Sequence, residues 1–130
     1  MNEEEKRKII DHNLKNGYAA LKYRHTHRHG RKASSCISYK QYLEVIKQPC
    51  VHCGCPPSIP IKAPDGSVLC LKNSVDRINS KGAYTKNNVQ PSCLQCNASK
   101  QKMKDEDFWA LAARITTYQA AKQTENTCQS

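Results

Sequence analysis

The sequence predicts a small α+β fold with flanking helices. Two hydrophobic patterns occur along the 130 residues: helical spacing near both ends, and short apolar or alternating runs in the middle. Eight cysteines stand in a chain with only 6% aromatic residues. A chain of this length is expected to form one domain with a thin core, so cysteine-based cross-linking would add stability that apolar burial does not supply.

The expected elements follow from spacing and from turn residues. The expected helices cover residues 3–28, a short segment capped by Ser38, residues 92–102, and a last helix that begins at Asp105 or Asp107. The expected strands cover residues 68–71 and 74–78, with a further short one at 88–90. Four prolines and two glycines lie within residues 54–67, which predicts a rigid loop with no regular element.

Positive charge dominates the chain, with 21 Lys+Arg against 11 Asp+Glu and a net charge of +10. No acidic residue occurs between Asp11 and Glu44, so residues 15–40 form a basic arm. Such an arm indicates a polyanionic partner, and DNA is the expected one. Side chains of this arm are expected to contact DNA phosphates: Arg24, Arg28, Arg31 and Lys32.

The compartment is expected to be cytoplasmic, and that of the host cell if a phage encodes the chain. No apolar run is long enough to cross a bilayer, which excludes a membrane-spanning protein. The start of the chain lacks the basic and apolar regions of a secretory signal. In a reducing compartment, eight cysteines indicate metal ligands or free thiols rather than disulfides.

Two C-x2-C pairs predict a structural zinc site. Their cysteines are Cys50, Cys53, Cys93 and Cys96. Each pair can bind a tetrahedral ion from one turn, and four thiolates form a closed site without catalytic activity. Cys55 or Cys70 could substitute in the first pair, whereas Cys36 and Cys128 have no paired spacing. His52 is expected to face the surface or DNA.

A second acid-poor stretch surrounds one carboxylate. From Gly66 to Lys104 the only acid is Asp76, and Asn97 follows the last paired cysteine. Held together by the zinc site, these two oxygen ligands would suit Mg²⁺ or a similar hard cation such as Mn²⁺. Lys100 lies one helical turn beyond Asn97, where it could meet a phosphate. On charge pattern alone, pairing of Asp76 with a neighbouring Lys or Arg is the simpler interpretation.

A family resemblance rests on motifs in a fixed order. They are Val75-Asp76-Arg77-Ile78, Gly82-Ala83-Tyr84-Thr85, Asn88-Val89-Gln90 and Cys93-Leu94-Gln95-Cys96-Asn97-Ala98-Ser99-Lys100. Together they resemble the HNH, or His-Me finger, endonucleases over about residues 36 to 118. The resemblance is greatest to small phage-type members with a four-cysteine zinc clamp, which include a phage recombination endonuclease that resolves branched DNA.

The resemblance implies a ββα-metal core and hydrolysis of a DNA phosphodiester. It makes Asp76 and Asn97 the ligands of a catalytic Mg²⁺ or Mn²⁺, and Asn88 the residue that orients the loop through backbone hydrogen bonds. The family usually places a histidine general base where this chain has Arg77, and a guanidinium cannot accept a proton. The candidates left open are His25, His27, His29, His52, Tyr84 and a metal-bound water.

The predicted organisation has three parts: a basic helical lead-in and DNA-binding arm (1–35), a zinc-clamped HNH endonuclease domain (36–123) and a disordered tail (124–130). The favoured function is a metal-dependent DNA endonuclease, with a nickase and a homing-type enzyme both open. A zinc-containing DNA-binding module without catalysis is the alternative. A thiol-redox protein is disfavoured because no βαβ pattern surrounds the cysteine pairs. The apolar face of the lead-in helix allows a homodimer.

Overall fold

The computed structural model describes residues 1–129, with side chains described for residues 1–124. In the part described, the helices are α1 (Glu3–Tyr23), α2 (Tyr39–Ile46), α3 (Leu94–Lys100) and α4 (Asp105–Gln129). A π-helical turn, η1 (Arg24–Arg28), continues α1, and short 3-10 turns lie at η2 (Ala33–Ser35) and η3 (Lys86–Asn88). The strands are β1 (Ile59–Lys62), β2 (Val68–Lys72), β3 (Ser74–Arg77) and β4 (Val89–Ser92).

Among the described residues the strands pair as separate antiparallel ribbons, β1 with β2 and β3 with β4. In the second ribbon Asp76 lies opposite Gln90 and Arg77 opposite Val89. Strand β1 corrects the prediction of a featureless loop over residues 54–67. Its Pro60 cannot donate to a ladder but is tolerated because β1 pairs along one edge only, and Ile61 is buried.

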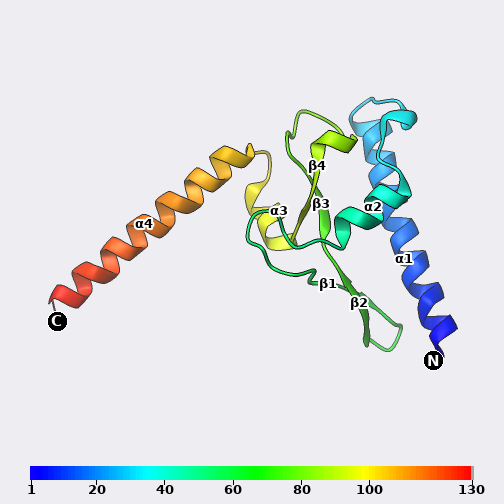
Figure 1. Ribbon diagram of the computed structural model, residues 1–130, viewed down its shortest axis with the longest axis horizontal. Helices are drawn as coiled ribbons and strands as arrows, with labels where there is room; N and C mark the ends of the chain where they lie inside the picture. The colour runs from blue at the N-terminus through cyan, green and yellow to red at the C-terminus, as the bar shows by residue number, and fades with distance from the viewer. Residues whose placement is uncertain (130) are drawn as a thin grey trace.

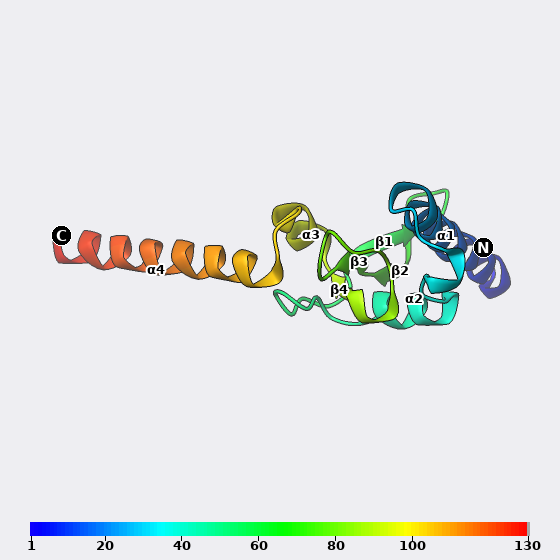
Figure 2. The same cartoon turned by 90° about the horizontal axis from the view of Figure 1, so that it is seen from above.

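The main hydrophobic cluster joins the lead-in to the centre of the chain. Its buried members are Leu21, Ile37, Tyr42, Ile46 and Tyr84, with Leu14, Val75 and Val89 packed against them. Helices α1 and α2 lie at the end of the molecule away from α4 (Figures 1 and 2). Leu14 and Leu21, on the face of α1 from which the sequence allowed a homodimer, thus pack within the chain.

Helix ends agree closely with the capping signals. Ser38 caps α2, as predicted. The structure adds a capping box between Ser38 and Gln41, and another between Asn2 and Glu5 at the start of α1. Cys93 rather than Ser92 caps α3, because its sulfur accepts from the Cys96 N–H group. In the described part of the chain, no helix has the length and hydropathy needed to cross a membrane.

Helix α4 projects from the rest of the molecule as a single rod (Figures 1 and 2). Phe108 and Leu111 near its start are partly buried, whereas Ile115 is 54% and Tyr118 62% exposed. The helix continues to Gln129, past residue 124, from which the sequence predicted a disordered tail. Cys128 lies outside the described side chains.

Candidate active site

The four paired cysteines come together at one end of the β3–β4 ribbon. Cys50 and Cys53 lie on the turn after α2, and Cys93 and Cys96 lie at the start of α3. Their sulfur atoms all lie within 4.8 Å of one another, and those of Cys53 and Cys93 are 3.9 Å apart. Tetrahedral zinc with bonds of about 2.3 Å needs sulfurs roughly 3.8 Å apart. The cluster could therefore bind zinc with little movement.

The first cysteine turn is built by its backbone. The Val51 N–H donates to the Pro91 carbonyl and docks the turn on β4, and Gly54 supplies the positive φ of +75° that the turn requires. Burial raises the pKa of the Cys50 thiol. Hydrogen bonds from backbone N–H groups, that of Cys53 foremost, outweigh burial and lower this pKa to about 6. The thiolate, which is the form that binds metal, is thus favoured.

The structure selects among the alternative cysteines. The sulfur of Cys55 is not in the group of four that lie within 4.8 Å of one another. Cys70 lies on β2, where its thiol donates to the Leu71 carbonyl. Cys50 and Cys53 therefore form the first half of the cluster, as the sequence predicted.

Asp76 is the centre of a buried polar network. Its Oδ2 atom accepts from Lys100 Nζ at 2.9 Å, from Gln90 Nε2 at 3.0 Å and from His52 Nε2 at 3.1 Å. Lys100 Nζ also donates to the Arg77 carbonyl and lies 2.7 Å from Asp105 Oδ1. Asp76, the only acid between Gly66 and Lys104, is thus paired with a lysine, which was the simpler interpretation of its surroundings.

Lys100 does not lie where a DNA phosphate could meet it. Its side chain is 1% exposed and is enclosed between the carboxylates of Asp76 and Asp105. Burial alone would lower the pKa of this ammonium, but the hydrogen bonds to Asp105 and Asp76 outweigh burial and raise it. The prediction that Lys100 contacts DNA is corrected: two buried acids hold the charge inside.

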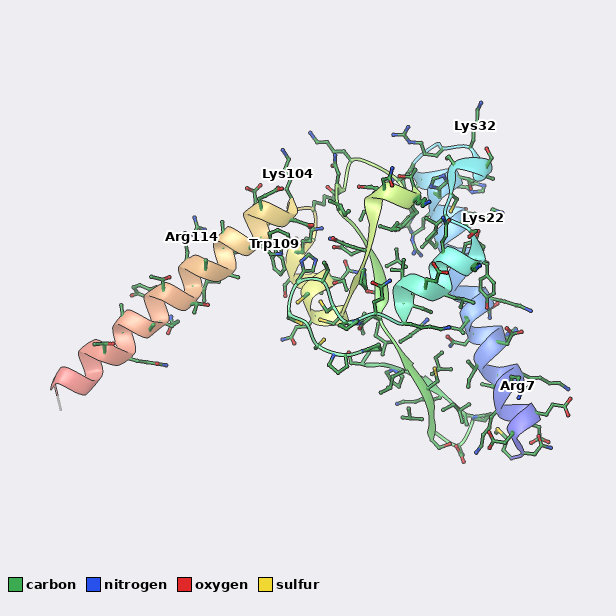
Figure 3. All side chains as sticks on the ribbon, in the orientation of Figure 1. Arg7, Lys22, Lys32, Lys104, Trp109 and Arg114 are labelled. Carbon is green, nitrogen blue, oxygen red and sulfur yellow. The ribbon has the colours of Figure 1, made fainter. Side chains whose placement is uncertain are left out.

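His52 is also buried rather than surface-facing, with a side chain 2% exposed. The Trp109 indole N–H donates to its Nδ1 at 3.0 Å, and because an indole can only donate, the ring proton lies on Nε2 and is donated to Asp76. Trp109 lies where α4 leaves the body (Figure 3). His52, Asp76 and Asp105 are spaced as metal ligands are, but the Lys100 ammonium contacts both carboxylates of this group.

Asn97 and Asp76 occupy the same side of β3. Asn97 Nδ2 donates to Ser74 Oγ at 3.3 Å, and Ser74 precedes Asp76 by two residues, so both project from one face of the strand. Helix α3 lies over this face, with Asn97 at the level of Ser74 and Lys100 at the level of Asp76. Within the described residues, no direct hydrogen bond joins Asp76 to Asn97.

Asn88 holds the loop between β3 and β4. Its Oδ1 accepts from the Asn79 N–H, while its Nδ2 donates to the carbonyls of Asn79 and Ala83. These are backbone hydrogen bonds of the kind that the family resemblance implied for this position. A Cβ on Gly82 would meet Asn88 Nδ2 at 2.6 Å, which explains why glycine stands there.

Arg77 projects to the other face of β3. Its Nη1 donates to the carbonyls of Ser80 and Gly82 at 2.8 and 2.9 Å and to His29 Nε2 at 3.1 Å. The guanidinium lies 5.4 Å from the centre of the Tyr84 ring. Arg24 lies at the same distance from this ring, and its Nε donates to the Tyr84 hydroxyl at 3.2 Å.

A cleft of 340 Å³ extends from Arg24 and Tyr84 to Asn97 on α3. Arg24, Lys72, Tyr84 and Asn97 are among the residues that line it. Guanidinium, ammonium, phenol and amide groups can all hydrogen-bond to phosphate oxygens. The cleft is therefore suited to a phosphodiester and contains one of the two predicted catalytic metal ligands.

The basic arm is anchored by one of the histidines that the sequence left open as a general base. His25 is fully buried, and its Nδ1 accepts from the Tyr84 N–H. Its Nε2 proton is then free to bond Ser35 Oγ at 2.9 Å and the Lys32 carbonyl at 3.1 Å. The arm residues Arg28, Arg31 and Lys32 are exposed, whereas Arg24 turns into the cleft. Figure 3 shows Lys32 projecting outward.

The β3–β4 ribbon, the loop held by Asn88 and helix α3 together define an HNH-like ββα fold with a cysteine cluster beside it. The fold class predicted from the sequence is thus confirmed. The chain is similar to a solved structure, the rare-cutting HNH restriction endonuclease PacI, for which an extraordinary mechanism of DNA perturbation is described. The TM-score is 0.54 at 18% identity, over 85% of this chain and 81% of that one. No protein-family model and no curated protein matches the sequence.

Proposed function

We propose that this chain is a metal-dependent DNA endonuclease of the HNH type. The observation that carries the proposal is the cleft, in which Arg24, Tyr84 and Asn97 meet within an HNH-like fold. Arg24 and Lys72 would bind oxygens of the scissile phosphate. Arg77 would hold the loop, since its Nη1 donates to two loop carbonyls.

Two kinds of metal site belong to this proposal. Zinc would be held by Cys50, Cys53, Cys93 and Cys96, whose spacing suits it. Asn97 and Asp76 would hold Mg²⁺ or Mn²⁺, and a carboxylate with an amide is a suitable oxygen donor set. Such an ion, when bound, neutralises charge on the scissile phosphate and on the leaving 3′ oxygen. To bind this ion, the Asp76 carboxylate must either contact the ion and Lys100 together or release its hydrogen bond from Lys100.

A second candidate function is a zinc-containing DNA-binding module without catalysis. The hydrogen bonds of Asp76 favour this function, because Lys100, Gln90 and His52 all donate to its Oδ2 atom, which a catalytic metal ion would need. The exposed arm supports DNA binding under both functions, through Arg28, Arg31 and Lys32.

Plasmid cleavage separates the two functions. Zinc-loaded protein is incubated with supercoiled DNA and Mg²⁺ or Mn²⁺, and nicked and linear products are quantified. Cleavage that Asn97→Ala and Asp76→Ala abolish, while the exposed Gln95→Ala on α3 retains it, supports the endonuclease. Intact DNA with all proteins, despite retained binding, would establish the binding module. The ratio of nicked to linear product distinguishes a nickase from an enzyme that cuts both strands.

We also propose that two copies associate through α4. This helix projects from the body, and its side chains Ile115 and Tyr118, which lie one turn apart on the same face, are 54% and 62% exposed. A second copy offers the same apolar stripe, so the contact would be self-complementary.

A further inference from the structure

The HNH endonucleases that the sequence resembles usually carry a histidine general base directly after the strand acid, and in this chain that position is occupied by arginine. Arg77 stands there and cannot give up a proton at neutral pH. A histidine from far away in the sequence lies against it: His29 Nε2 is 3.1 Å from Arg77 Nη1. We propose that His29 is the general base that activates the attacking water. The inference rests on the proposed endonuclease function.

The hydrogen bond fixes the form of the His29 ring. Because a guanidinium only donates, Nε2 is the acceptor and carries the lone pair, while the ring proton lies on Nδ1. Arg77 Nη1 has two hydrogens and three acceptors, and its bonds to Ser80 and Gly82 are the shorter ones. The loop carbonyls therefore hold Arg77 without His29, and the Nε2 lone pair can turn to a water molecule.

The surroundings keep this imidazole neutral. Burial foremost, and then the positive charge of Arg77, lower the pKa of His29. Arg77 faces the ring from β3, and the side chains Arg24, Arg28 and His25 face it from η1. Each of these groups lowers the pKa of His29. Tyr84 meets the ring edge-on at 5.9 Å between centroids. A neutral imidazole at physiological pH is the form that a base requires.

The other histidines are less suited. His52 has both nitrogens engaged, by Trp109 and by Asp76, and His25 is anchored between Tyr84 and Ser35. His27 stacks on Tyr23 at 4.0 Å, on the exposed side of the arm. His29 instead borders the cleft, because it contacts the Tyr84 ring that lines it. Tyr84 itself is the remaining competitor.

The proposed step conserves atoms and charge. The water oxygen forms a bond to phosphorus as its proton passes to His29 Nε2. The bond between phosphorus and the 3′ oxygen breaks, and solvent protonates the leaving oxygen. The imidazolium then returns its proton to solvent, and the products carry a 5′ phosphate and a 3′ hydroxyl.

The test compares full-length, zinc-loaded proteins in a pH series of plasmid cleavage. His29→Gln keeps an acceptor for Arg77 but cannot take a proton, and His29→Ala leaves room for added imidazole. We expect kcat to fall by about 10²- to 10⁴-fold in both variants, a range typical of general-base loss. Imidazole should restore cleavage to His29→Ala and not to His29→Gln. His27→Ala is the matched control and should cleave like the wild type.

The pH profile identifies the base. Wild-type cleavage should rise with pH through a pKa below 6.5, since the base must be unprotonated, and this limb should persist in Tyr84→Phe and vanish in His29→Gln. Wild-type rates in His29→Gln would overturn the inference and leave the endonuclease function standing. So would a rise confined to alkaline pH that Tyr84→Phe removes. If the wild type cuts no DNA, the endonuclease function fails, and the inference fails with it.

Discussion

Lys100 is the residue on which the buried network depends. Its ammonium lies 2.9 Å from Asp76 and 2.7 Å from Asp105, and the side chain is 1% exposed. We expect Lys100→Met to lose about 3–5 kcal/mol of unfolding free energy, because it leaves two buried carboxylates without their partner. Urea unfolding of the zinc-loaded protein measures this. Lys102→Met, on the exposed surface just after α3, is the control.

The pH dependence of folding stability provides a second test of Lys100. The folded pKa of Lys100 is raised above 10.5, so its contribution is fully present below that value. It is lost as pH rises through the higher folded pKa. Thermal unfolding should therefore show an alkaline loss of stability in wild type that is absent from Lys100→Met. Parallel curves for the two proteins would contradict the role given to the ion pair.

The sequence located this network only in part. Asp76 stood out because no other acid lies near it in the chain, and Lys100 was placed close to Asn97 by helical spacing. Their mutual burial was not predictable, since a lysine is almost never fully buried without a partner and the second partner, Asp105, belongs to a different helix. His52 was expected to face the surface or DNA, and its burial was not predicted because Trp109 and Phe108, which contact it, lie outside the motifs.

Among the elements, the cysteine turn and the start of α3 depend on one another through the metal. Chelation should lower the melting temperature, since a closed four-thiolate site contributes directly to folding. Cys53→Ser should lose the bound zinc, whereas Cys55→Ser should keep one zinc per chain because Cys55 lies outside the group of four. Metal analysis and melting curves of the two variants provide the measurement. Equal zinc loss in both would show that Cys55 is a ligand.

Local patterns predicted most elements but not their long-range partners. Ser38, the strand at 74–78 and the last helix were located from caps and periodicity. Strand β1 was missed because Pro60 signals a loop, whereas pairing with β2 and burial of Ile61 decide the conformation. The arm histidines alternate in sequence, but η1 buries His25 and places His29 in contact with Arg77. No local pattern predicts these contacts, because they join segments far apart in the chain.

For the molecule as a whole, the net charge of +10 makes DNA affinity salt-dependent. Arg28, Arg31 and Lys32 are exposed on the arm, and each one replaced by Gln should reduce the slope of log K against log salt by about 1 if it contacts a phosphate. Arg7 lies toward the other end of α1 (Figure 3), so Arg7→Gln is the control. Binding titrations at several salt concentrations measure the slopes. Equal slopes for the arm variants and the wild type would remove the arm from the interface.

The projecting helix α4 decides whether the molecule works as one copy or two. Phe108, Leu111, Ile115 and Tyr118 follow the alternating spacing of three and four residues that forms a coiled-coil stripe. If two copies pair along this stripe, light scattering should give the wild type twice the chain mass of 14.7 kDa. Ile115→Glu should have the mass of a single chain. Ala113→Glu, on the opposite face, should remain paired.

Pairing also bears on the product of cleavage. Two copies related by a twofold axis present one cleft to each DNA strand, because the strands of a duplex are antiparallel. Ile115→Glu should therefore shift plasmid products from linear to nicked while each cleft stays intact. A monomeric wild type that yields linear DNA directly would contradict this coupling, and a monomeric wild type that only nicks would identify the single chain as the working unit.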